Sequence, residues 1–372
     1  MTNTEPFPAP VPGPELSIVV PTFNEADNIG LLVEAVAAAA TGIAWELVFV
    51  DDHSPDGTAE RVRGIARDDA RVRIVHRYGR RGLSSACVEG IMSSSAPCCI
   101  VMDADFQHDE RIIPALFAAI RSGEADLAVG SRYTDGGGFG GWDKRRVAIS
   151  KLATRLAARL TGTAMTDPMS GFFAVRRDSF MRSLPGLSSI GFKVLLDIAA
   201  SAPAPLVVVE VPYTFRTRQR GESKLDTLVL WQYIELLIDK TIGRYVSTRF
   251  VSFAVVGGLG VAVHFLILTS LYMGLGTSFG VAQTAATVVA ISNNFFLNNA
   301  LTYSDRRLRG RRLFWGWITF NLICATGAAA NVGVADYLFA RPVNWVLSAF
   351  AGILVSVVWN YTISNAVTWR RK

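Results

Sequence analysis

The first two thirds of the chain alternate short apolar runs with segments of helical periodicity. Six apolar runs predict strands, at residues 16–23, 45–52, 72–77, 98–102, 126–133 and 206–215. Four segments between them predict helices, at residues 28–40, 54–68, 83–94 and 110–121. Strands separated by helices of this length indicate parallel βαβ units. We therefore expect an α/β domain with a mainly parallel sheet over residues 15–224, after a disordered Pro-rich tail over residues 1–14.

The last third of the chain is dominated by long apolar stretches. Residues 225–249 mix apolar and charged side chains at helical spacing, which predicts amphipathic helices in a membrane interface. Four later stretches, 250–273, 279–303, 313–339 and 345–369, are each long enough to cross roughly 30 Å of hydrocarbon. We expect an all-α domain with four transmembrane helices over residues 250–372; a soluble domain with buried helices is the alternative. Asparagines in these stretches are costly in lipid, so we expect them to face helix partners or a polar cavity.

The charge distribution favours a membrane surface over nucleic acid as the partner of this chain. The formal net charge is +6 over 372 residues, and the basic residues cluster beside the apolar stretches. No zinc-finger, helix-turn-helix or aromatic RNA-binding pattern is present in the sequence. Residues 304–313 hold five arginines, and Arg-Arg-Lys ends the chain. By the positive-inside rule, we expect this loop, both termini and the α/β domain to face the cytoplasm, as in an inner-membrane protein of bacterial type.

Acidic side chains gather where the predicted strands end. Four carboxylates and one arginine fall at such ends: Asp51, Asp52, Asp103, Asp105 and Arg132. If the chain stays extended after residue 102, Asp103, Asp105 and Gln107 face the same way. Converging carboxylates repel each other and lose hydration, so they require a positive partner; an ordinary surface turn is the alternative. Parallel sheets bind ligands beyond the carboxyl ends of their strands, so we expect the functional site at this edge.

Six segments in order resemble one family: VVPTFNEADNI, VDDHSPDGT, DADFQH, GSRY, TDPMSGFFA and PYTFRTRQRGESK. They are similar to the polyprenol-phosphate mannosyltransferases, or dolichol-phosphate mannose synthases, which are inverting enzymes of glycosyltransferase family 2. The resemblance implies a Rossmann-like catalytic domain of the GT-A fold. The membrane part resembles the GtrA-like four-helix domains, through its number of spans, its GGLG segment and its asparagine-rich second span.

The resemblance also implies a reaction and a metal ion. Mannose would pass from a nucleotide-diphosphate sugar, GDP-mannose, to a polyprenyl (dolichyl or undecaprenyl) phosphate in the membrane. The family motif places the ligands of Mg²⁺ or Mn²⁺ at Asp103, Asp105 and Gln107, which supply hard oxygen donors. The ion would stabilise the departing nucleoside diphosphate. The matched nucleotide-sugar-binding positions are Pro21, Phe23, Glu25, Asp52, Asp103, Asp105 and Gln107.

The acceptor phosphate requires cations on the other side of the site. The candidates are Arg132, Arg146, Ser150, Arg218 and Lys224. A guanidinium can hold a phosphate through two hydrogen bonds, whereas an ordinary surface salt bridge is the expected role of Arg216 or Arg220. With Asp105 and Arg132, Asp167 completes the candidate catalytic set, and a structural cap is its alternative role. We expect Phe106 to pack and assign no role to His108.

Two other functions are compatible with the motifs. Close relatives with nearly all of them transfer glucose from UDP-glucose to undecaprenyl phosphate. A non-catalytic translocator or scaffold for lipid-linked sugars would make the membrane domain the functional part. Anchoring, movement of product across the bilayer and homo-oligomerisation are all compatible with that domain.

Overall fold

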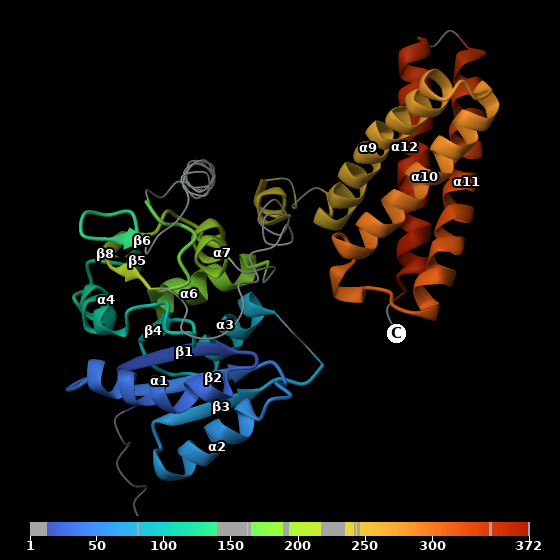
Figure 1. Cartoon of the computed structure of the whole chain (residues 1–372). Coiled ribbons are helices and arrows are strands. Elements are labelled where there is room, and N and C mark those ends of the chain that lie inside the picture. The colour runs from blue at the N-terminus through green and yellow to red at the C-terminus, as the bar shows by residue number, and fades with distance from the viewer. Residues whose placement is uncertain are drawn as a thin grey trace, which may run out of the picture. The chain divides into compact units, whose positions relative to one another are not determined.

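The computed structural model of the chain describes residues 13–79, 82–139, 162, 165–188, 193–216, 235–241, 243, 246–341 and 344–370. The chain divides into two compact units, Met1–Thr241 and Ile242–Lys372, which are described separately below. Figure 1 shows the sheet and its helices in the first unit and a set of long helices in the second.

A mainly parallel sheet organises the first unit. In the described part of the chain it has seven strands in the order β3-β2-β1-β4-β7-β5-β8. Their bounds are β1 Leu16–Thr22, β2 Trp45–Asp51, β3 Val72–His76, β4 Cys98–Val101, β5 Leu127–Ser131, β7 Phe173–Arg176 and β8 Val208–Pro212. Strand β7 runs antiparallel between β4 and β5, and the other pairings are parallel. The predicted fold class is therefore confirmed. Two short strands, β6 (Gly138–Phe139) and β9 (Thr214–Phe215), form a second small sheet.

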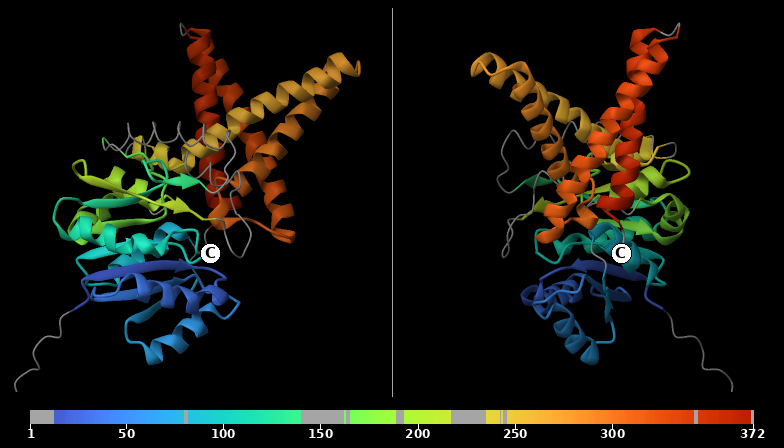
Figure 2. Two further views of the ribbon diagram at one scale, coloured as in Figure 1. Left: turned by 60° about the vertical axis from the view of Figure 1, so that its left-hand side comes forward. Right: turned by 90° about the vertical axis from the view of Figure 1, so that its right-hand side faces the viewer.

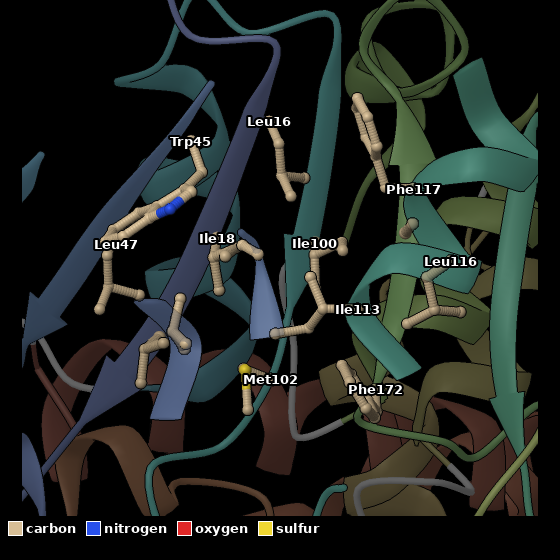
Figure 3. Close-up of a cluster of buried hydrophobic side chains, with 14 of the residues drawn as sticks. Leu16, Ile18, Trp45, Leu47, Ile100, Met102, Ile113, Leu116, Phe117 and Phe172 are labelled. Carbon is tan, nitrogen blue, oxygen red and sulfur yellow. The ribbon is translucent and has the colours of Figure 1, made fainter. Parts of the chain in front are cut away.

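Helices cover both faces of the seven-stranded sheet. Their bounds are α1 Ala26–Ala39, α2 Thr58–Asp68, α3 Leu83–Met92, α4 Ile113–Arg121, α6 Arg177–Ser183 and α7 Val194–Ser201. Alternate side chains of each strand enter opposite cores: Ile18 of β1 joins the core under α1, α2 and α4, and Val19 joins the core under α3, α6 and α7. Figure 3 shows part of the first core, where Ile18, Ile100 of β4 and Ile113 of α4 lie together. These two apolar layers hold the strand ends in fixed positions.

Four long helices make up most of the second unit. They are α9 Thr248–Thr269, α10 Phe279–Ala300, α11 Arg311–Phe339 and α12 Trp345–Ile363, and short π-helical turns extend α9 to Gly274 and α12 to Thr368. Helix α9 packs on α10, and α11 packs on α12, as can be followed in Figures 1 and 2.

Three of the described helices are long and apolar enough to cross a membrane: Thr248–Gly274, Arg311–Phe339 and Phe350–Thr368. The expected count of four spans was therefore not met in full. Helix α10 has 22 residues, which is enough to span a bilayer, but its four asparagines, together with glutamine and threonine side chains, lower its hydropathy, and it is not among these three.

Glycine–asparagine contacts hold the paired helices together. Gly260 of α9 faces Asn294 of α10, and Gly327 of α11 faces Asn360 of α12. Gly352 of α12 faces Asn331 of α11 so closely that an added Cβ would lie 2.5 Å from the Asn331 carbonyl oxygen. Small residues allow such close approach of helix backbones in membranes. Asparagines therefore face helix partners at these contacts, one of the two placements that the sequence analysis expected for them.

This packing predicts opposite outcomes for two glycine substitutions. Gly352→Ala forces the backbones of α11 and α12 apart, and we expect it to destabilise the second unit by about 1–3 kcal/mol. Gly333→Ala on α11 is the matched control, because its Cβ meets no atom within 4 Å. Thermal unfolding of the full-length protein in detergent measures both effects. Equal melting temperatures for the two variants would contradict the proposed close contact.

Candidate active site

Strained backbone marks the carboxyl ends of three neighbouring strands. Asn24, His53 and Phe106 follow β1, β2 and β4, and their φ angles are 63°, 57° and 61°. Non-glycine residues rarely adopt this left-handed conformation, and those that do cluster at functional sites. The three turns place the segments after these strands at one edge of the sheet, where the sequence predicted a site.

The acidic segment after β4 is a turn and not an extended strand. Strand β4 ends at Val101, so the expected alternation of side chains does not continue through residues 103–107. Instead, the Gln107 backbone N–H donates to Asp105 Oδ1 at 3.1 Å, which closes the turn around Asp105. Asp105 is 4% exposed, whereas the Asp103 side chain is 40% exposed. Phe106 packs against the first core, as predicted.

His108 lies beneath this turn and fixes Asp103. Its Nδ1 accepts a hydrogen bond from the Asp103 backbone N–H at 3.1 Å, and its ring stacks on Phe172 with centroids 5.1 Å apart. Because Nδ1 is an acceptor, the ring proton is on Nε2, which lies 3.9 Å from Asp103 Oδ2. Burial lowers the pKa of His108 to about 4, so the ring is neutral at pH 7. The sequence alone suggested no role for His108.

Gln107 connects the turn to the segment after β9. Its backbone carbonyl accepts from the Arg216 N–H at 3.0 Å, and its Nε2 donates to the Arg216 carbonyl at 3.5 Å. The Arg216 guanidinium pairs with Asp109 at 2.6 Å and with Glu110 at 2.9 Å. The expected salt-bridge role of Arg216 is therefore confirmed, and these contacts hold the residue after β9 against the acidic segment.

The ends of β1 and β2 bring together the residues predicted to bind the nucleotide sugar. Asp52 pairs with Arg77 Nη1 at 2.7 Å and accepts the Gly82 N–H at 2.8 Å. The Arg77 side chain is 1% exposed, and no motif in the sequence points to this residue. Glu25 accepts from the Asn28 amide at 2.7 Å at the start of α1. Pro21 pairs with Val50 inside the sheet, and Phe23 follows in the turn.

Asp51 has a different environment from Asp52. Its carboxylate is fully buried and accepts hydrogen bonds from the Ser54 N–H at 3.0 Å and the Ser54 hydroxyl at 2.5 Å. These bonds close the turn after β2. Asp51 therefore has a structural role in this turn.

Arg132 and Asp167 form a buried, bidentate ion pair beyond β5. Arg132 Nε lies 2.6 Å from Asp167 Oδ2, and Nη2 lies 2.7 Å from Oδ1. The Asp167 side chain is fully buried and that of Arg132 is 10% exposed. Burial lowers the pKa of Arg132, but the hydrogen bonds and charge of Asp167 outweigh this effect and raise it overall. Glu210 of β8 accepts the N–H groups of Thr166 and Asp167, which holds the aspartate in place.

Lys193, which was not predicted as a site residue, is affected by the charges of the same site. It directly precedes α7. Burial lowers the pKa of Lys193 to about 8; the charge of Arg132 also lowers it, whereas Asp167 and Asp103 raise it. Because the charges of Arg132, Asp167 and Asp103 all act on it, Lys193 adds positive charge to the part of the site that these residues form. Its sequence context, GFKVLLD, contains no motif that would have revealed it.

Four predicted acceptor ligands, Arg146, Ser150, Arg218 and Lys224, lie outside the described residues. Within the described ranges, no three or more His, Cys, Asp and Glu side chains form a cluster that could hold a metal ion. The predicted ligand set differs from such a cluster, since one of its three members is the amide of Gln107.

Comparisons with known proteins extend over both units. The family model for glycosyl transferase family 2 matches residues 17–184, and the model for the GtrA/DPMS transmembrane domain matches residues 252–369. The chain is 34% identical over 357 residues to a dolichol-phosphate mannosyltransferase of Pyrococcus furiosus, covering 95% of this chain and 99% of that protein. It is 35% identical to the dolichol-phosphate mannosyltransferase of Saccharomyces cerevisiae, covering 64% and 91%. It is also 35% identical to the polyprenol monophosphomannose synthase of Mycolicibacterium smegmatis, covering 56% and 80%.

The buried His108 predicts a pH dependence of stability. Its pKa of about 4 in the folded protein lies below the value near 6.5 in the unfolded chain. Its contribution is therefore complete above about pH 6.5 and is lost as the pH falls toward 4, because only the unfolded chain takes up the proton. When the pH falls from 6.5 to 5, His108 should lower the free energy of unfolding by roughly 1.5 kcal/mol, which corresponds to about 3–6 °C in melting temperature.

The control is His108→Asn, whose side-chain oxygen can accept the Asp103 N–H without titrating. Melting of the full-length protein in detergent and EDTA, measured from pH 5 to 7, compares the two proteins. The variant should show the flatter pH profile. Parallel profiles would show that His108 does not titrate as its burial requires.

Proposed function

Because the chain belongs to the dolichol-phosphate mannosyltransferases, whose catalytic part is a glycosyltransferase family 2 domain, we propose that it transfers mannose from GDP-mannose to a polyprenyl phosphate with inversion at the sugar. The family relationship confirms the resemblance found in the motifs and the assignment as a glycosyltransferase. The identity of the donor and the roles of individual residues are part of the proposal.

One observation carries the proposal: a single sheet edge holds the acidic turn beside a buried arginine–aspartate pair. The turn carries Asp103, Asp105 and Gln107, and the pair is Arg132 with Asp167. The charges of Asp103, Arg132 and Asp167 all act on the pKa of Lys193, which supports one continuous site. Such a site suits a reaction between two anions, because it offers acidic ligands for one partner and cations for the other.

The residues of the acidic turn fit a divalent cation. Two carboxylates and an amide oxygen are hard donors of the type that Mg²⁺ and Mn²⁺ prefer. The Gln107 amide donates through Nε2 to Arg216, which leaves Oε1 as the ligand atom. His108 would keep Asp103 in place through its backbone N–H. When bound, the metal would stabilise the charge on the departing nucleoside diphosphate.

The acceptor side requires binding and orientation more than proton transfer. A polyprenyl phosphate is already an anion, so its attacking oxygen needs little help from a general base. Asp167 fixes the plane of the Arg132 guanidinium through two hydrogen bonds, and a fixed guanidinium can hold a phosphate bidentately. Since the Arg132–Asp167 pair is neutral as a unit, further cations are required, and we assign this role to Lys193 with Arg146, Arg218 and Lys224; Ser150 adds a hydroxyl.

The second unit makes the chain a membrane protein, and we propose an inner-membrane location with the catalytic unit and both termini in the cytoplasm. Residues 304–313, which include most of the connection between α10 and α11 and the first residues of α11, carry five arginines, and this supports a cytoplasmic loop if α10 also spans the bilayer. A membrane-impermeant maleimide applied to intact cells should then label Thr277→Cys and leave Ser304→Cys unlabelled. The reverse labelling would invert this topology.

A product assay tests the proposed function. The purified full-length protein is incubated with polyprenyl phosphate, Mg²⁺ or Mn²⁺, and either GDP-mannose or UDP-glucose. Mass spectrometry should detect polyprenyl-phosphate hexose from GDP-mannose, and EDTA should abolish it. Product from UDP-glucose alone would establish the glucosyltransferase alternative, and no product from either donor would favour a non-catalytic role.

Two variants serve as controls for the metal assignment in this assay. Asp105→Asn removes one charged ligand without changing the size of the side chain, and turnover should fall roughly 100-fold or more while the melting temperature stays near that of the wild type. Asp69→Asn, which alters a surface pair with Arg71, should leave turnover unchanged. Undiminished turnover of the Asp105→Asn variant would refute the assignment of a metal ion to this position.

A further inference from the structure

A short helix just before the membrane unit packs on the catalytic unit. Residues 235–241 are helical and belong to the same compact unit as the sheet. Leu236 is 1% exposed and packs against Leu196 of α7, which is fully buried. Leu237 and Met169 complete this cluster. The segment therefore contacts α7 and the loop that carries Asp167, two residues before Met169.

Lys240 of this segment inserts its charge into the catalytic unit. Its Nζ lies 2.6 Å from Asp197 Oδ1 and donates to the Gly186 carbonyl at 2.7 Å and to the Ser201 hydroxyl at 2.9 Å. All three ammonium protons are thereby satisfied. The side chains of Lys240 and Asp197 are only 7% and 2% exposed. Ser188 donates to both oxygens of Asp197, at 3.2 Å from its N–H and 2.8 Å from its hydroxyl.

Attachment of the segment does not by itself require this ion pair. Leu236 and Leu237 already supply apolar contact with α7. Removal of two charges from water is costly, and a buried pair often contributes no net stability compared with an apolar pair. The pair instead fixes the geometry, because two hydrogen bonds from Lys240, two from Ser188 and the Lys240–Asp197 charge contact hold both side chains in a single arrangement.

The first turn of α7 connects this ion pair with the candidate site. The Asp197 backbone N–H donates to the Lys193 carbonyl at 3.0 Å, so Asp197 lies one helical turn after Lys193. The ion pair with Lys240 thus holds the first turn of α7, which directly follows Lys193, and the charges of Arg132 and Asp167 both act on the pKa of this lysine. A second connection is apolar, because Leu236 packs in one cluster with Met169, which lies in the loop that carries Asp167.

We propose that the Lys240–Asp197 pair is a positioning device that makes residues 235–241 part of the acceptor side of the active site. The pair fixes the position of Lys193 relative to the Asp167 loop. Its lysine belongs to the segment that precedes the first membrane helix, α9, in the sequence. Lys240 and Asp197 do not touch the substrates and act through Lys193. This inference rests on the proposed function, because it concerns binding of the lipid phosphate.

The test replaces both charges, since a single replacement would leave the other charge buried and unpaired. Asp197→Asn with Lys240→Met keeps the approximate shapes and removes the fixed geometry. In the full-length protein in detergent, we expect the KM for polyprenyl phosphate to rise about tenfold and the KM for GDP-mannose to change less than twofold. Hydrogen exchange at residues 194–198 should become at least about tenfold faster, because the first turn of α7 loses its support.

A surface ion pair provides the matched control. Asp69→Asn with Arg71→Met removes a pair whose side chains are 23% and 51% exposed, and both KM values should stay unchanged. If the double variant Asp197→Asn with Lys240→Met is folded, as verified by its melting temperature, an unchanged ratio of its two KM values would overturn the proposal. If the wild type transfers no mannose, the proposed function fails, and unchanged hydrogen exchange at residues 194–198 would then refute the coupling separately.

Discussion

Crowded carboxylates at one edge of a parallel sheet are the constraint on which the catalytic unit depends. The ends of β1, β2 and β4 are held together by two apolar cores, so the acidic residues that follow them cannot separate. Each is compensated differently. Asp51 accepts bonds from Ser54, Asp52 pairs with Arg77, and the Gln107 N–H donates to Asp105. Asp103 is the most exposed of the four, which suits a ligand for a cation from solvent.

The same constraint explains the shape of the loops around the site. Left-handed residues after three strands turn the chain sharply, so that backbone N–H groups reach carboxylates within a few residues. His108 lies where a charged ring would be buried among Phe172, Tyr213 and Phe215, and it is kept neutral. At the proposed acceptor side, Arg132 and Asp167 form an ion pair and neutralise each other. The proposed binding of a phosphate there would depend on geometry as much as on net charge.

The two units solve the burial of polar groups by different means. In the catalytic unit, Lys240 and Asp197 are buried with a full set of hydrogen bonds, and they link the last helix of the unit to α7. In the membrane unit, asparagines lie against glycines of the neighbouring helix, where backbones approach closely. Both devices fix one helix against another, and the first also connects the juxtamembrane segment to the residues proposed to bind the lipid phosphate.

The sequence by itself determined the mainly parallel sheet, the acidic motif and the separate membrane part, because these follow from periodicity, spacing and hydropathy within short windows. It did not reveal β7, a four-residue strand inserted antiparallel between β4 and β5. Nor did it reveal that a turn follows Val101 and breaks the expected alternation of side chains. Arg77, His108, Lys193 and Lys240 gained their meaning only from tertiary structure. Their partners are set by packing and burial, which no local pattern encodes. Lys240 pairs with Asp197 across 43 positions of sequence, and the charge of Arg132 acts on the pKa of Lys193 across 61.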